Sequence, residues 1–88
     1  MMQVIFSNNI PPSNEWPKRL SQREFKVALL VAHGFSNKKV AHELGLRDGT
    51  VKVYLNSIFQ KLGAKRRYDL IVQLSRDGSP AGELKHLP

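Results

Sequence analysis

One short stretch of the chain, residues 46–63, combines the spacing of a helix with side chains that can recognise nucleobases. Lysine can donate hydrogen bonds to guanine, asparagine can pair with adenine through two hydrogen bonds, and valine can rest against a thymine methyl group. Residues of all three types occur in this stretch, and no acidic residue follows Asp48 within it. Because a surface that approaches phosphates must avoid carboxylates, the pattern favours contact with a polyanion.

These side chains share a face only if the stretch folds as a helix. Its apolar residues recur at helical period and predict a buried stripe on a helix over about residues 49–62: Val51, Leu55, Ile58, Phe59 and Leu62. The opposite face then carries Thr50, Lys52, Val53, Asn56, Ser57, Gln60 and Lys61. Thr50 would lie in the first turn, beside unpaired helix amides that can bind a phosphate. An ordinary solvated face remains the alternative interpretation.

Three further helices are predicted, over about residues 21–33, 36–44 and 67–76. Ser21 and Glu24 have the spacing of a capping box, and Ser36 can cap the next helix. Glycines that fit the left-handed position end three of the four helices: Gly34, Gly45 and Gly63. The inward residues of the three helices are predicted to be Val27, Ala28, Leu30, Val31, Val40, Ala41, Leu44, Leu70, Ile71 and Leu74. The expected fold class is all-α, a four-helix domain that contains a helix-turn-helix.

A chain of 88 residues has room for one small domain. Because Pro11, Pro12 and Pro17 disfavour a regular helix, residues 1–18 are predicted to form an extended or disordered arm. Residues 19–76 are the predicted helix-turn-helix domain, and residues 77–88 a flexible tail.

The charge of the chain is strongly positive, with 14 basic and 7 acidic residues and a net charge of +7. Such a balance indicates a polyanionic partner, either a nucleic acid or an anionic membrane. The membrane is disfavoured, because no apolar run approaches the length of a span and the basic helix needs its apolar face for the core. A soluble, cytoplasmic and nucleoid-associated protein is expected.

Catalytic and metal chemistry find little support in the composition. The chain has no cysteine and three scattered histidines, so we expect no metal site and no cofactor. The serines at 21, 36 and 57 have cap or surface explanations, and no acid is spaced to orient His42. We therefore do not expect an enzyme.

Cations occupy the amino ends of two predicted helices, where they oppose the helix dipole: Lys38, Lys39, Lys65, Arg66 and Arg67. Arg47 and Arg66 also stand where a short polar residue normally caps a helix. Contact with phosphate would explain these placements. A helix cap shifted to Asp48 is the alternative explanation for Arg47.

Together these residues resemble the LuxR-type (GerE-like) helix-turn-helix, which is found as the output domain of FixJ- and NarL-like bacterial response regulators. The similarity covers about residues 19–75 without an insertion. It rests on Leu20-Ser21 with Arg23-Glu24, Ala32-x-Gly34, Ser36-Asn37-Lys38 with Ala41 and Leu44, Thr50-Val51-Lys52, Ile58, and Lys61-Leu62-Gly63 with Arg67. Tyr54 departs from the family pattern, since this position is usually histidine.

The resemblance implies that the third helix enters the major groove of DNA and that the fourth helps to form a dimer on paired half-sites. Base contacts would then come from Lys52, Val53 and Asn56. Phosphate contacts would come from Thr50, Lys61, Lys38, Arg47, Arg66 and Arg67. The fourth helix offers Tyr68, Ile71, Val72 and Ser75 for a homodimer contact.

The leading hypothesis is a dimeric, sequence-specific transcriptional regulator that binds double-stranded DNA. The alternative is a helix-turn-helix fold used as a protein interaction module, an adaptor for another regulator chain or for RNA polymerase, with MMQVIF and the fourth helix as its working surfaces. A sigma-factor-like fragment is a third interpretation. Family members commonly carry a receiver or ligand-binding domain before this module, and the residues before the first predicted helix are too few to supply one. We expect a stand-alone regulator, an input from another chain, or a piece of a longer protein.

Overall fold

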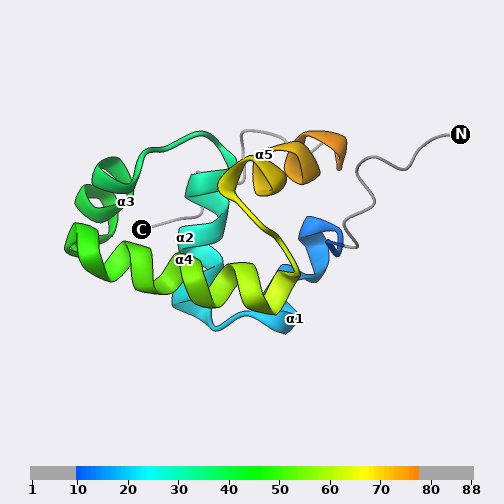
Figure 1. Ribbon diagram of the computed structural model, residues 1–88, viewed down its shortest axis with the longest axis horizontal. Helices are drawn as coiled ribbons and strands as arrows, with labels where there is room; N and C mark the ends of the chain where they lie inside the picture. The colour runs from blue at the N-terminus through cyan, green and yellow to red at the C-terminus, as the bar shows by residue number, and fades with distance from the viewer. Residues whose placement is uncertain (1–9, 78–88) are drawn as a thin grey trace, which may run out of the picture.

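The computed structural model describes residues 10–77, and the regular structure over that range is entirely helical (Figure 1). The elements are the 3-10 helix η1 Ser13–Glu15 and the α-helices α1 Trp16–Arg19, α2 Gln22–Ala32, α3 Asn37–Leu44, α4 Asp48–Leu62 and α5 Arg67–Arg76. The predicted all-α fold is confirmed, and the four predicted helices correspond to α2 to α5. None of the helices within residues 10–77 has the length and hydrophobicity of a membrane span.

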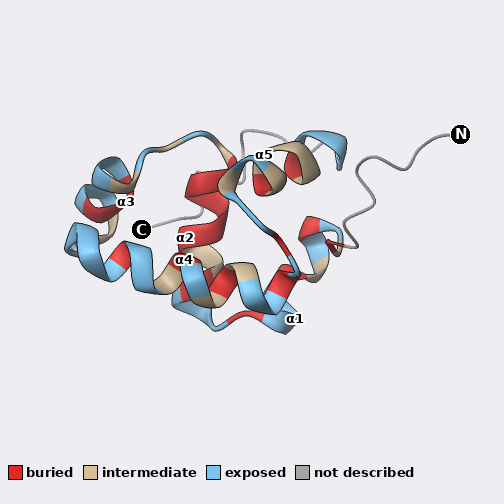
Figure 2. Ribbon diagram, viewed as in Figure 1, coloured by how far each residue is buried: buried red, intermediate tan, exposed pale blue. Residues whose placement is uncertain are grey.

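Helix α2 is the centre of the domain and packs against α1, α3, α4 and α5. Residues 27–32 of α2 are all buried, and Figure 2 shows this helix as the most continuously buried one. The other elements contribute fully buried side chains to the same core, including Trp16, Val40, Val51, Ile58 and Leu70. The predicted core residues are buried except for Leu44, Phe59 and Ile71, which are half-buried.

The predicted arm covers residues 1–18, and the structure corrects it over the part that it describes, residues 10–18. Residues 13–19 form η1 and α1, and Trp16 has no exposed surface. Its indole Nε1 donates a hydrogen bond of 2.9 Å to the Pro11 carbonyl oxygen. The sequence predicts that Pro17 disfavours a helix, but Pro17 lies in the first turn of α1, where the missing amide hydrogen would have no helical partner. Residues 1–9, which include MMQVIF, lie outside the described residues.

Asp77, the first residue of the predicted tail, is ordered by contacts with the rest of the domain. Asp77 accepts a hydrogen bond of 2.6 Å from the Ser13 amide and one of 2.9 Å from Gln73 Nε2. Its carboxylate therefore joins the end of α5 to η1, across 64 positions of sequence. Residues 78–88 lie outside the described residues.

Local signals set the ends of the main helices as predicted. The Ser21 hydroxyl accepts the Glu24 amide at 3.1 Å while the Glu24 carboxylate accepts the Ser21 amide at 2.8 Å, which confirms the capping box. The Ser36 hydroxyl caps α3 by accepting the Lys39 amide at 3.1 Å. The three glycines that were predicted to end helices all have positive φ: Gly34, Gly45 and Gly63.

Gly45 makes the turn between α3 and α4, and its substitution tests the cost of that turn. At φ +68°, an added β-carbon would meet no atom within 4 Å, so the penalty for Gly45→Ala is confined to the backbone. We expect a loss of about 1–2 kcal/mol in the free energy of unfolding, measured by urea denaturation. Gly49→Ala is the matched control, because Gly49 lies inside α4, where alanine is favoured by up to about 1 kcal/mol. Equal effects of the two substitutions would contradict the turn assignment.

Candidate nucleic-acid interface

Helix α4 carries one buried face and one exposed face, as its spacing predicts. Val51 and Ile58 have no exposed surface, and Leu55 and Leu62 are nearly as buried. The predicted base-contacting residues Lys52, Val53 and Asn56 are all exposed on the other face. We call this exposed set, with Gln60, the polar face of α4.

Val53 is the residue on this face that the fold does not explain. It is 67% exposed, and over residues 10–77 the other exposed large hydrophobic residue is Tyr68, at 59%. An isolated exposed apolar residue is ordinary on a protein surface. Here, however, it lies between a lysine and an asparagine on a helix face that has no acidic residue, a combination that suits contact with base edges in a major groove.

The predicted phosphate contacts near the start of α4, Arg47 and Thr50, are exposed to solvent. Arg47 is the N-cap residue of α4, makes no capping hydrogen bond with its side chain, and is exposed. Asp48 is the first residue of the helix rather than its cap, so the shifted cap that was the alternative for Arg47 is wrong. Thr50 is exposed in the first turn of α4, at the positive end of the helix dipole.

Two further predicted cations are also available to an anion. Lys38 is exposed in the first turn of α3. The Arg66 side chain is 75% exposed, and its Nε is 3.8 Å from an oxygen of Asp69. At that distance and exposure, the ion pair contributes little and leaves the guanidinium accessible.

Arg67, by contrast, is committed to the fold. Its guanidinium donates a hydrogen bond of 2.7 Å to Asn37 Oδ1 and another of 2.7 Å to the Phe35 carbonyl oxygen. Arg67 is half-buried, and its side chain joins the first residue of α5 to the segment at the start of α3. The structure thus gives Arg67 an internal role that the sequence did not indicate, and its phosphate contact stays a prediction.

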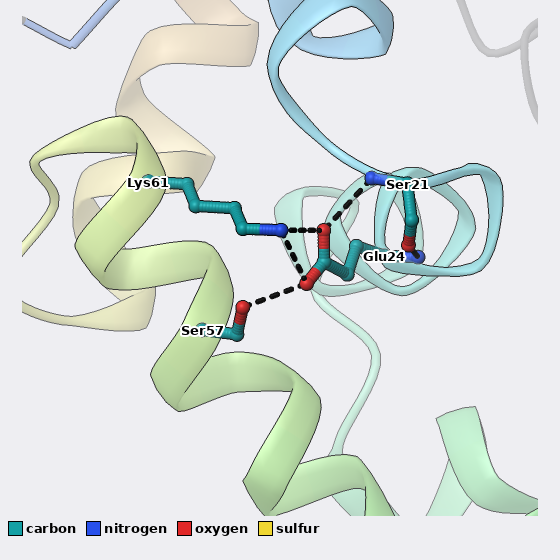
Figure 3. A network of polar contacts seen from close by, with 4 residues as sticks. All are labelled: Ser21, Glu24, Ser57 and Lys61. Carbon is teal, nitrogen blue, oxygen red and sulfur yellow. Dashed lines mark hydrogen bonds and ion pairs between the residues drawn. The ribbon is translucent and has the colours of Figure 1, made fainter.

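Lys61 also has an internal partner, which Figure 3 shows. Its ammonium donates to both oxygens of Glu24, at 2.9 and 3.1 Å, and the Ser57 hydroxyl donates to Glu24 Oε2 at 2.7 Å. With the hydrogen bond from the Ser21 amide, the carboxylate accepts from three residues. We call Glu24, Ser21, Ser57 and Lys61 the Glu24 network.

The Glu24 network changes the acidity of its carboxyl group. Burial by itself raises the pKa of Glu24, whose residue surface is only 6% exposed. Hydrogen bonds from the Ser57 hydroxyl, the Ser21 amide and the Lys61 ammonium outweigh this effect and lower the pKa from 4.5 to about 2. The carboxylate is therefore charged at neutral pH and holds α2 against α4.

The sequence indicated only the link between Ser21 and Glu24. Ser57 and Lys61 stand four residues apart, on the border between the buried stripe and the polar face of α4. That spacing places both donors on one flank of the helix, and it was the available signal for a shared acceptor. The acceptor itself lies 33 and 37 positions away, beyond the reach of local patterns.

The residues predicted for a dimer contact lie along α5. Tyr68 is 59% exposed and Ser75 is exposed, whereas Ile71 and Val72 are half-buried. Leu70 and Leu74 supply the buried face of the same helix. The four predicted residues are therefore accessible at least in part, and the dimer stays a prediction.

Comparison with known proteins identifies the family. Residues 18–74 match the family described as bacterial regulatory proteins, luxR family. The chain is 34% identical over 71 residues to the two-component response regulator PprB of Pseudomonas aeruginosa. This match covers 81% of this chain and 26% of PprB. It is 43% identical over 61 residues to the transcriptional activator RamA of Corynebacterium glutamicum, covering 69% of this chain and 22% of RamA.

A third relative is the transcriptional regulator MalT of Yersinia enterocolitica, which is 39% identical over 57 residues, or 65% of this chain and 6% of MalT. The chain thus spans about a quarter or less of the length of these relatives. The resemblance inferred from the sequence over residues 19–75 is confirmed. The chain belongs to the luxR family of bacterial regulatory proteins.

Proposed function

We propose that the chain is a sequence-specific transcriptional regulator that binds double-stranded DNA with α4 in the major groove. The observation that carries the proposal is the polar face of α4, exposed and free of acidic residues after Asp48, on a helix whose other face is anchored in the core. The family and the names of the relatives support the coarser part, DNA-binding regulation of transcription. Such a role would place the protein at the nucleoid.

Within this proposal, three residues read bases. Lys52 donates to guanine, Asn56 pairs with adenine, and Val53 contacts a thymine methyl group. Thr50, Lys38, Arg47 and Arg66 hold phosphates, and their exposure supports that role.

We further propose that two copies meet through α5, with Tyr68 at the centre of the contact. Two-fold symmetry of the protein would be matched by a palindromic operator with half-sites about one helical turn apart, or a multiple of it. Another regulator chain or RNA polymerase would be a further partner of the same bound complex.

Selection from a library of random duplexes tests the proposal, and Lys52→Ala measures the base contact. We expect one enriched palindromic motif, and we expect Lys52→Ala to weaken binding to it by about 1–3 kcal/mol, measured by fluorescence anisotropy. Binding to duplexes of mixed sequence should weaken much less.

Lys18→Ala is the matched control, because Lys18 is an exposed cation on α1. It should weaken binding to both kinds of duplex slightly and alike. If the wild-type protein retarded no duplex at low salt, the adaptor hypothesis would replace this one.

A further inference from the structure

The Glu24 network ties the DNA-facing helix to the centre of the domain at one carboxylate. Two donors from α4, Ser57 and Lys61, meet Glu24 from α2, and Figure 3 shows them converging from adjacent turns of α4. The carboxylate cannot swing with α4, because the Ser21 amide also holds its Oε1 at 2.8 Å. Its place is therefore set by the amino end of α2.

Arg23, the residue before Glu24 on α2, contacts α3, the first helix of the helix-turn-helix. Arg23 Nη1 donates to the carbonyl oxygen of Leu44, the last residue of α3, at 3.4 Å. This contact is long and exposed, so it is weaker than the contacts of Glu24. Together, the two residues connect the first turn of α2 to the end of α3 and to the second half of α4.

The network also determines what Lys61 can offer to DNA. A cation strengthens binding and its salt dependence when it neutralises a phosphate and so displaces counterions from DNA. The Lys61 side chain is 46% exposed, but its ammonium is already paired with a carboxylate whose side chain is only 8% exposed. To reach a phosphate it would have to leave a buried charge with one partner fewer, which costs more than breaking a surface pair.

We infer that Glu24 is a positioning residue for the DNA-reading helix α4, and that Lys61 is its internal counter-ion rather than a phosphate contact. This inference rests on the proposed function, since it assumes that α4 binds DNA. It assigns Lys61 a role different from the one the sequence predicted. It also makes neutral Glu24 a condition in which Lys61 becomes free for DNA.

The salt dependence of binding to a fluorescein-labelled duplex of mixed sequence tests the role of Lys61. The slope of log affinity against log salt is measured between about 50 and 200 mM, where each phosphate contact contributes about 0.9. We expect Lys61→Gln to leave the slope unchanged. We expect Glu24→Gln to steepen it by about 0.9 and to raise non-specific affinity roughly fivefold to tenfold, because Lys61 is released. The double variant Glu24→Gln/Lys61→Gln should return to the wild-type slope.

Glu43→Gln is the control for charge alone, because Glu43 is an exposed carboxylate on α3, the helix that packs beside α4. A general gain of positive charge would steepen the slope for this variant as much as for Glu24→Gln. We expect a much smaller change. Circular dichroism at the assay temperature establishes that each variant is folded, and if Glu24→Gln does not fold, the slope of Lys61→Gln alone decides.

The positioning role of Glu24 has its own readout. For the selected operator, the ratio of specific to non-specific affinity should fall for Glu24→Gln by about tenfold, which corresponds to the loss of one base contact. A purely structural defect would lower both affinities equally and leave the ratio unchanged.

Three results would overturn the inference: a shallower salt dependence for Lys61→Gln, an unchanged salt dependence for folded Glu24→Gln, or an unchanged ratio of specific to non-specific affinity for Glu24→Gln. If the wild-type protein bound no duplex at any salt concentration, the proposed function itself would fail.

Discussion

Trp16→Ala is expected to lower the free energy of unfolding by about 3–5 kcal/mol, the range for removing a large buried aromatic side chain. Trp16 has no exposed surface and belongs to the hydrophobic core formed by residues 10–77. Its indole also donates to the Pro11 carbonyl oxygen, an acceptor that the substitution leaves without this donor. Since domains of this size have a total stability of about 5–15 kcal/mol, the urea concentration at the midpoint of unfolding, followed by circular dichroism, should fall substantially.

Two variants serve as controls for this prediction. Trp16→Phe keeps an aromatic ring but loses the hydrogen bond, so its effect should be intermediate. Lys18→Ala changes an exposed residue of the same short helix and should stay within about 0.5 kcal/mol of the wild type. If residues 1–18 were a disordered arm, Trp16→Ala would be as mild as Lys18→Ala, and the ordered segment described here would be wrong.

The contrast between Trp16 and α4 explains what could be predicted from the sequence. The stripe of Val51, Leu55, Ile58 and Leu62 repeats at helical period, so the helix and its exposed face followed from local spacing. Trp16 occurs once, beside a proline, in a segment of seven residues with no repeat to detect. Its burial depends on α2 and on the rest of the core, which no local pattern describes.

The charged residues show the same limit. Lys52, Arg47 and Lys38 are predicted to contact DNA, and the structure leaves them exposed. In the sequence, nothing distinguishes Lys61 and Arg67 from the other predicted phosphate contacts. In the structure, each has hydrogen-bond partners about 30 or more positions away. Charge and spacing identify which residues can contact an anion, whereas the fold determines which of them already have partners inside the domain.

Glu24→Gln is expected to lower the free energy of unfolding by about 3 kcal/mol at pH 7. The pKa of Glu24 is about 2 in the folded protein against an ordinary 4.5, and each pKa unit corresponds to about 1.36 kcal/mol. Because the folded pKa is the lower one, this stabilisation is complete above about pH 4.5. It is lost as the pH falls toward 2, where the carboxyl is protonated in the folded protein as well.

The difference in stability between the wild type and Glu24→Gln isolates this group from the other carboxylates. Measured by urea denaturation at a series of pH values, it should be about 3 kcal/mol at pH 7 and shrink between pH 4.5 and 2. Glu15→Gln is the matched control, since Glu15 is half-exposed and lies 3.8 Å from Arg19. Its difference should stay below about 1 kcal/mol. A difference for Glu24→Gln that did not change with pH would mean that its carboxylate is not held by charge, and α4 would then be fixed by apolar packing alone.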